Sequence, residues 1–179
     1  MKLSYLVVVS LLACAGAASA DPVVRLRPLD SLAAEALERG VSRSTSMRKQ
    51  VAELQNSDLI VYIQIKSTVP NSVAGATQLM TKAGGHRYVS ISLSRELSLD
   101  GRTAILAHEL QHACELARST ASDQADVRAL YVAIGRQVPG KKDVFETREA
   151  DEAGQRVWIE LHGQYTGGAS TWQIWRAAK

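Results

Sequence analysis

Residues 104–116 read AILAHELQHACEL and contain the pattern His-Glu-x-x-His at positions 108–112. On a helix, His108 and His112 are one turn apart and project from the same side, so their imidazole nitrogens can reach one metal ion. Glu109 is offset from the side of the helix that carries the two histidines. Its carboxylate therefore need not bind the metal and can still accept a proton from a metal-bound water. The stretch therefore predicts a helix that carries two metal ligands and a general base.

The opposite side of this predicted helix is apolar. Leu106, Leu110, Ala113 and Ala117 form a stripe there, bulky at its start and small at its end. Such a stripe is typical of a half-buried helix that faces a cleft. The alternative is a surface helix that happens to carry two histidines. The stripe counts against that alternative, because a surface helix has no need to exclude polar residues from one side.

Two histidines leave a zinc site incomplete, because a catalytic zinc ion usually takes three protein ligands and one water. Glu115 lies on the same side of the helix as the histidines. It is about 10 Å from His108 along the axis, so it cannot converge with both histidines on one ion. The third ligand is therefore expected from another segment of the chain.

A predicted helix from about residue 144 to about residue 162 offers two candidate carboxylates. Glu146 would lie at the start of a stripe formed by Ala150, Ala153, Gly154, Val157 and Leu161. Small residues allow two helices to approach closely, and an inward Glu146 would be a costly buried charge unless a metal ion offset it. We therefore expect Glu146 to be the third ligand, with Glu149 at the flank of that face as the alternative. Asp151 and Glu152 are expected to point toward solvent.

Two motifs carry a resemblance to known metallopeptidases. The pattern at 108–112 with a downstream helical Glu resembles the gluzincin branch of the zincin metallopeptidases. Residues 148–154, READEAG, are similar to the Glu-x-x-Ala-Asp-x-x-Gly element of the membrane metallopeptidases that include the prenyl-protein proteases. In those families the ligand Glu precedes the Asp by four positions, whereas Thr147 stands four positions before Asp151 here.

The resemblance implies a zinc ion held by His108, His112 and a downstream carboxylate. It also implies a zinc metallopeptidase that hydrolyses protein or peptide substrates, with Glu109 as general base on a zinc-bound water. The alternative function is a secreted, non-catalytic binding or structural domain that keeps the zinc fold, because zinc can serve stability as well as chemistry.

Capping residues and apolar spacing predict the other elements. The expected helices cover 29–40, 44–55, 123–135 and about 144–162, and the expected strands cover 59–65, 77–81 and 86–93. Asp30 or Ser31 would cap the first helix and Gly40 would end it. Asp100 would cap the helix that contains His108.

The strand expected over 86–93 alternates polar residues with Val89, Ile91 and Leu93, so one of its faces should be buried. These elements predict an α+β, zincin-like fold, mostly helical, with a small β-sheet packed beside the HExxH helix. An extended peptide is expected to add to the sheet edge along residues 88–93.

The chain begins with features of an export signal. Residues 1–20 combine a positive charge, an apolar run from 3 to 13 and an Ala-x-Ala end, so we expect a signal peptide followed by a single domain over 21–179. This predicts a periplasmic or secreted protein. Residues 11–14, Leu-Leu-Ala-Cys, also resemble a lipobox, so a lipoprotein anchored through Cys14 is the alternative.

Composition narrows the classes of partner. The 21 Lys and Arg residues exceed the 18 Asp and Glu residues only slightly and are spread along the chain, which disfavours a nucleic-acid binder. No second apolar run is long enough to span a membrane. If Cys14 is removed with the signal, Cys114 is the last thiol, and we expect it to be packed in the core rather than to act as a nucleophile.

Five further residues have side chains that can stabilise an oxyanion: His86, His162, Tyr88, Tyr165 and Arg156. For each of them we expect an ordinary structural or surface role instead.

Overall fold

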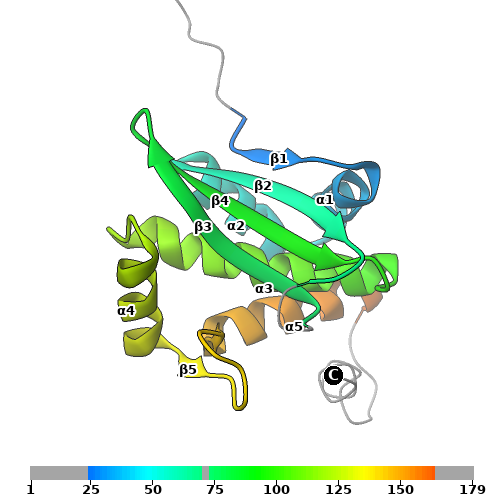
Figure 1. Cartoon of the computed structure of the whole chain (residues 1–179). Coiled ribbons are helices and arrows are strands. Elements are labelled where there is room, and N and C mark those ends of the chain that lie inside the picture. The colour runs from blue at the N-terminus through cyan, green and yellow to red at the C-terminus, as the bar shows by residue number, and fades with distance from the viewer. Residues whose placement is uncertain (1–23, 70–72, 164–179) are drawn as a thin grey trace, which may run out of the picture.

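The computed structural model describes residues 24–69 and 73–163, which form an α+β fold (Figure 1). Its helices are α1 (Ser31–Arg43), α2 (Thr45–Gln55), α3 (Leu99–Arg118), α4 (Gln124–Ile134) and α5 (Arg148–His162). Its strands are β1 (Leu26–Pro28), β2 (Leu59–Lys66), β3 (Gly75–Ala83), β4 (His86–Ser94), β5 (Arg136–Gln137) and β6 (Phe145–Glu146). The expected signal peptide, Cys14 and Tyr165 lie outside the described residues.

The main sheet has the strand order β1-β2-β4-β3. β1, β2 and β4 are parallel and β3 is antiparallel to β4. Val89, Ile91 and Leu93 of β4 are buried, as their alternation predicts. The expectation that a peptide adds along 88–93 is wrong, because β2 and β3 already pair with both sides of β4. β3 stands at the edge instead, and it is longer than the predicted 77–81.

Helix α3 lies at the centre of the structure, with the sheet in front of it and α5 beside it (Figure 1). Every residue from 101 to 116 is buried. The prediction of a half-buried helix facing a cleft is therefore wrong: α1, α2 and α5 pack against α3 on the sides that the sheet leaves uncovered. Ser98, not Asp100, caps α3 through a hydrogen bond from the Gly101 N–H to the Ser98 hydroxyl oxygen (3.2 Å).

Helix α1 starts as predicted, with the Asp30 side chain accepting from the Ala33 N–H (2.9 Å). It does not end at Gly40 but continues to Arg43. Gly40 is buried, and a Cβ atom on it would lie 1.8 Å from the sulfur of Met47 on α2. The glycine therefore serves the close contact between two helices rather than a helix C-cap.

Helix α5 begins later than predicted. Thr147 caps it by accepting from the Ala150 N–H (3.1 Å), so Glu146 lies in β6 and not in the helix. β6 pairs with β5, which places Glu146 opposite Arg136. The expected stripe from Ala150 to Leu161 is confirmed as the buried face of α5, and its small residues let α5 pack closely on α3.

A buried arginine holds the C-terminal end of α3. The Arg87 guanidinium donates to the carbonyl oxygens of Leu116 (2.8 Å) and Ala121 (2.9 Å) and to both carboxylate oxygens of Asp58. The hydrogen bond and charge of Arg87 lower the pKa of Asp58 below its ordinary value, although partial burial acts in the opposite direction. This contact links β4 to the end of the central helix.

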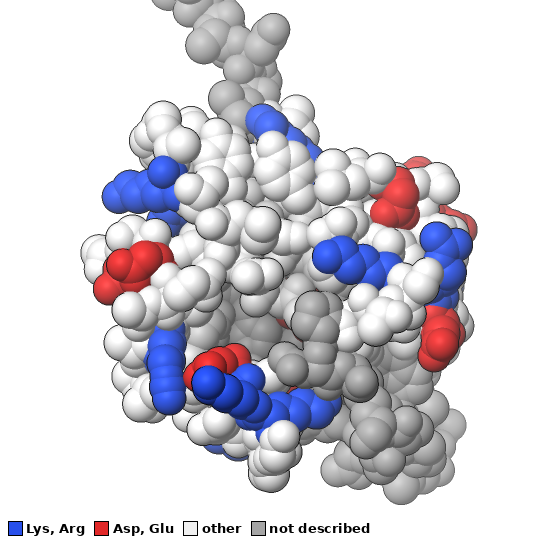
Figure 2. All heavy atoms as spheres, viewed as in Figure 1, with Lys and Arg blue, Asp and Glu red and all other residues white. Residues whose placement is uncertain are grey.

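Charges of both signs share the surface. On the face seen in Figure 2, Lys and Arg side chains lie among Asp and Glu side chains and uncharged residues. Within residues 24–69 and 73–163, we find no helix whose length and apolar character would let it cross a membrane.

We predict that Gly40→Ala destabilises the protein by about 1–3 kcal/mol, because the added methyl group collides with Met47 in a packed interface. At an open helical position the same change would stabilise by about 1 kcal/mol. Urea unfolding of the single variant and of Gly40→Ala in a Met47→Ala background tests this. A single variant as stable as the wild type would contradict the steric account.

We predict that Asp58→Asn lowers stability by about 2 kcal/mol at neutral pH, because it removes the charge that faces buried Arg87. The folded-state pKa of Asp58 is lowered, so this stability is present above the ordinary value of 3.8 and is lost as pH falls through the folded-state pKa. The two proteins should therefore converge in urea midpoint at strongly acidic pH. Glu53→Gln, at the exposed Arg118 ion pair, is the matched control and should change little.

Candidate metal centre

One helix, α3, and one short strand, β6, bring three metal-ligating side chains together. Ligand atoms of His108, His112 and Glu146 all lie within 4.8 Å of one another. His108 Nε2 and Glu146 Oε2 are 2.9 Å apart. Both histidines are 6% exposed. Two imidazoles and one carboxylate are a donor set that suits zinc, and three protein ligands leave one coordination position for a water or a substrate.

Glu146 reaches this group by a different route from the one that its sequence suggests. The expectation that Glu146 begins the inward face of a helix is wrong, because Glu146 precedes α5. Its pairing with β5 and the Thr147 cap of α5 hold the carboxylate toward α3 instead. The alternative ligand, Glu149, is exposed in the first turn of α5 and is not part of the group.

Asp151 faces the site rather than solvent, so that expectation is wrong. Its Oδ1 lies 3.9 Å from His108 Nδ1, and its Oδ2 lies 3.4 Å from the guanidinium of Arg136 on β5. Asp151 follows buried Ala150 and so lies at the flank of the buried face of α5. His108 and Arg136 lie on either side of its carboxylate. The Ala-Asp part of the READEAG stretch was the available signal for this residue.

The electrostatic setting of His108 favours a positive charge. Burial, which is the largest effect, lowers the pKa of His108, but Glu146, Glu109 and Asp151 together raise it above the ordinary value. A site in which carboxylates outweigh the desolvation of an imidazolium is also favourable for a divalent cation. The donor chemistry and the local charge therefore both fit a metal ion.

His112 is held from behind by a second carboxylate. Its Nδ1 lies 2.9 Å from Glu115 Oε2, and Glu115 Oε1 accepts from the hydroxyl of Thr147 at 2.6 Å. Glu115 therefore orients a histidine rather than acting as a ligand, in agreement with its exclusion on distance. The outward Nε2 of His112 is left for the ligand group, as in metal sites where a carboxylate fixes the histidine tautomer.

Tyr131 of α4 completes the surroundings of His112. Its hydroxyl donates to the His112 carbonyl oxygen (3.1 Å), and its ring meets the imidazole edge to face at 5.4 Å. Burial, followed by the nearby carboxylates of Glu115 and Glu109, raises the pKa of Tyr131, so the hydroxyl remains a donor. Sequence reasoning missed this residue because only the packing of α4 brings it to the site.

Glu109 lies between α3 and the edge strand β3. It is 4% exposed, and its Oε2 accepts from the hydroxyl of Thr77 at 2.7 Å. Gly75 leaves the space that this carboxylate occupies, since a Cβ atom there would be 2.6 Å from Glu109 Oε1. Neither Thr77 nor Gly75 has a local sequence signal that points to this contact.

Four of the residues considered as oxyanion donors make structural contacts elsewhere. His86 meets Arg25, His162 meets Asp100, Arg156 meets Glu152 and Tyr88 stacks on Tyr62. Cys114 is buried, and burial raises the pKa of its thiol to about 12, which suits a packed core residue and not a nucleophile.

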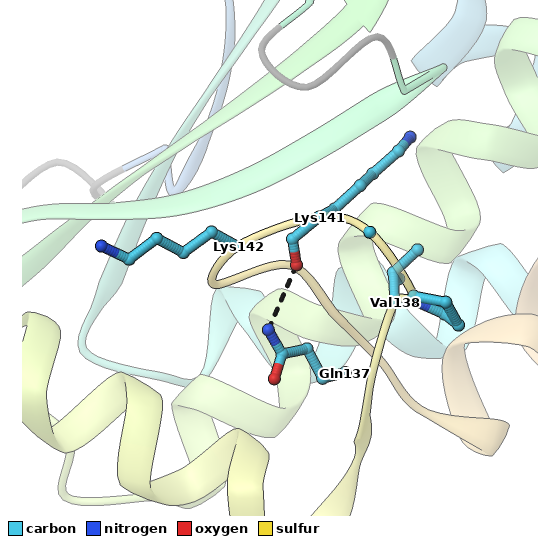
Figure 3. Close-up of a pocket in the computed structure, with 6 residues that line it drawn as sticks. Gln137, Val138, Lys141 and Lys142 are labelled. Atoms are coloured by element: carbon cyan, nitrogen blue, oxygen red, sulfur yellow. Dashed lines mark hydrogen bonds between the residues drawn. The ribbon is translucent and has the colours of Figure 1, made fainter.

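A separate surface cavity lies in the connection between β5 and β6 (Figure 3). It is lined by Gln137, Val138, Pro139, Gly140, Lys141 and Lys142. The Gln137 side chain donates to the Lys141 carbonyl oxygen at 3.2 Å and closes the loop. None of the three ligand residues lines this cavity.

Comparisons of the chain with models of known protein families, with curated proteins and with solved structures found no match.

Proposed function

We propose that this protein is a zinc-dependent metallopeptidase with a zincin-like, gluzincin-type site. The observation that carries the proposal is the convergence of His108, His112 and Glu146 within 4.8 Å, with Glu109 on the same helix as the histidines. The carboxylates behind both imidazoles support a metal site, because such partners fix histidine ligands in metalloproteins.

When bound, a zinc ion would polarise the peptide carbonyl and make the attacking water more acidic. The residues of this chain supply the other functions. Glu109 takes the proton from the attacking water and later passes it to the leaving amine. Thr77 holds the Glu109 carboxylate through one oxygen and leaves the other for this proton transfer. Asp151 and Glu115 keep the two imidazoles in place.

An extended substrate would fit beside β3. The Ala74 carbonyl accepts from the Ser94 N–H (2.8 Å), so alternation along β3 turns the main-chain groups of Gly75, Thr77 and Leu79 away from β4. The Leu79 carbonyl already accepts from Gln124 of α4. The proposal therefore puts the peptide along the part of β3 between Gly75 and Gln78, next to Glu109.

The second candidate is a non-catalytic zinc-binding or structural domain. It is favoured by the burial of Glu109 and by the hydrogen bond that already engages its carboxylate. Export, with or without a lipid on Cys14, remains a prediction for either function. The two candidates differ in whether Glu109 is needed for turnover.

We predict that Glu109→Gln lowers the hydrolysis of denatured protein substrates about a hundred- to ten-thousand-fold, because Gln cannot accept the proton. Its zinc content should match that of the wild type, since Glu109 is not in the ligand group. Turnover by zinc-loaded protein and metal analysis are the measurements. Peptidase activity that survives the substitution would defeat the mechanism, and a wild type that binds zinc without turnover would favour the second candidate.

We predict that Glu146→Ala weakens zinc binding more than about 100-fold, because the loss of a ligand should cost at least as much as the loss of a residue that orients one. Glu149→Ala, three residues away and exposed, is the matched control and should leave zinc affinity unchanged. Competition with a chromophoric chelator measures both. Equal effects of the two substitutions would remove Glu146 from the ligand set.

A further inference from the structure

We infer that Thr147 is a positioning residue that holds two of the metal ligands, His112 and Glu146, in register with each other. The inference rests on the proposed metal site and concerns metal affinity rather than hydrolysis. Thr147 directly follows Glu146 in the chain, and its hydroxyl reaches Glu115, which in turn contacts His112. One side chain therefore links ligands that come from different elements.

The hydroxyl of Thr147 makes two hydrogen bonds, one as donor and one as acceptor. It donates its single proton to Glu115 Oε1 at 2.6 Å, and it accepts from the Ala150 N–H at 3.1 Å. The side chain is 1% exposed, so water cannot replace either bond. A hydroxyl is the group that provides one donor and an acceptor at the same atom, and both bonds have defined partners here.

The contact to Glu115 matters for His112. Glu115 accepts a hydrogen bond from the Thr147 hydroxyl on one carboxylate oxygen and faces His112 Nδ1 with the other. The Thr147 bond therefore fixes the rotation of the carboxylate, and the carboxylate fixes the tautomer and ring plane of His112. Without this bond, Glu115 would lose the orientation that directs His112 Nε2 toward the other candidate ligands.

The position of Glu146 depends on its neighbours on both sides. On the N-terminal side, β5 pairs with β6 and places Arg136 opposite Glu146. Gly135 allows this approach, since a Cβ atom there would be 2.9 Å from the Glu146 carbonyl oxygen. On the C-terminal side, Thr147 fixes the chain to α5 by the cap and to α3 through Glu115.

Substitutions at Thr147 distinguish the role of its hydrogen bond to Glu115 from the role of its cap on α5. Thr147→Ser retains the donor and the acceptor. Thr147→Asp retains a good cap for α5 but cannot donate, and its negative charge faces Glu115. Thr147→Val keeps the shape and loses both bonds. A residue that serves only as a helix cap would tolerate Asp, whereas a residue that positions Glu115 would not.

The experiment measures zinc affinity of the full-length protein by chelator competition, together with melting of the metal-free forms. We expect Thr147→Asp and Thr147→Val each to weaken zinc binding about 10- to 100-fold, which is the usual loss when a residue that supports a ligand is removed. Thr147→Ser should restore affinity to within about threefold of the wild type. The metal-free Thr147→Asp protein should keep the cap of α5 but melt below the wild type, because its carboxylate would be buried against that of Glu115.

Two further variants keep the inference falsifiable if Thr147→Asp does not fold. Glu115→Gln should weaken zinc binding to a similar extent, because Gln has a single acceptor oxygen and its NH2 group must then face either Thr147 or His112 Nδ1. Asp30→Ala, which removes the cap of α1 far from the ligands, should lower stability but leave zinc affinity unchanged.

Zinc affinity that is the same in the wild type, Thr147→Val and Glu115→Gln would overturn the inference, as would a wild type that does not bind zinc. In another outcome the wild type binds zinc and the variants rank in zinc affinity as expected, while no peptide substrate is hydrolysed. That result would support the inference and overturn the proposed peptidase function. The two failures are therefore distinguishable.

Discussion

The structure depends on burying a cluster of charged and polar side chains that project from its central helix, α3. His108, Glu109, His112 and Glu115 are all less than 10% exposed, although they carry groups that water solvates well. Burying such groups is favourable only when each has a partner. The neighbouring elements supply those partners: β3 brings a hydroxyl to Glu109, β6 brings Glu146 to His108, and the start of α5 brings a hydroxyl to Glu115.

This requirement explains the arrangement around α3. Glu109 meets the edge strand β3 of the sheet, whereas the histidines meet Glu146 of β6 and α5 packs on α3. The small residues of α5 allow that approach, so the ligand from β6 can reach the histidines. Alternation along β3 leaves its outer main-chain groups next to Glu109. The same helix therefore determines both the packing of the neighbouring elements and the positions of the candidate ligands. A substitution that changes this packing is expected to move the candidate ligands as well.

The parts of the site that follow from local spacing could be predicted from the sequence. His108, Glu109 and His112 share one helix, so their relative positions need no knowledge of the fold. The structure brings Glu146 close to the two histidines, but not as part of a helical face, because the cap by Thr147 moves the start of α5 beyond it. Thr77, Tyr131 and the inward side of Asp151 could not be predicted, since only tertiary packing brings them to α3. Similarly, Gly40 looks like a helix end until Met47 is seen against it.

The wide separation of the ligands along the chain has a consequence for folding. His112 and Glu146 are about 34 residues apart, and the segment between them contains α4 and β5. A metal ion bound to both would stabilise the folded state through its binding free energy, because the unfolded chain does not hold these ligands together. Cys114 is a free, buried thiol, so within the part of the chain that the structure describes such a coordinate link would join two segments that no disulfide joins.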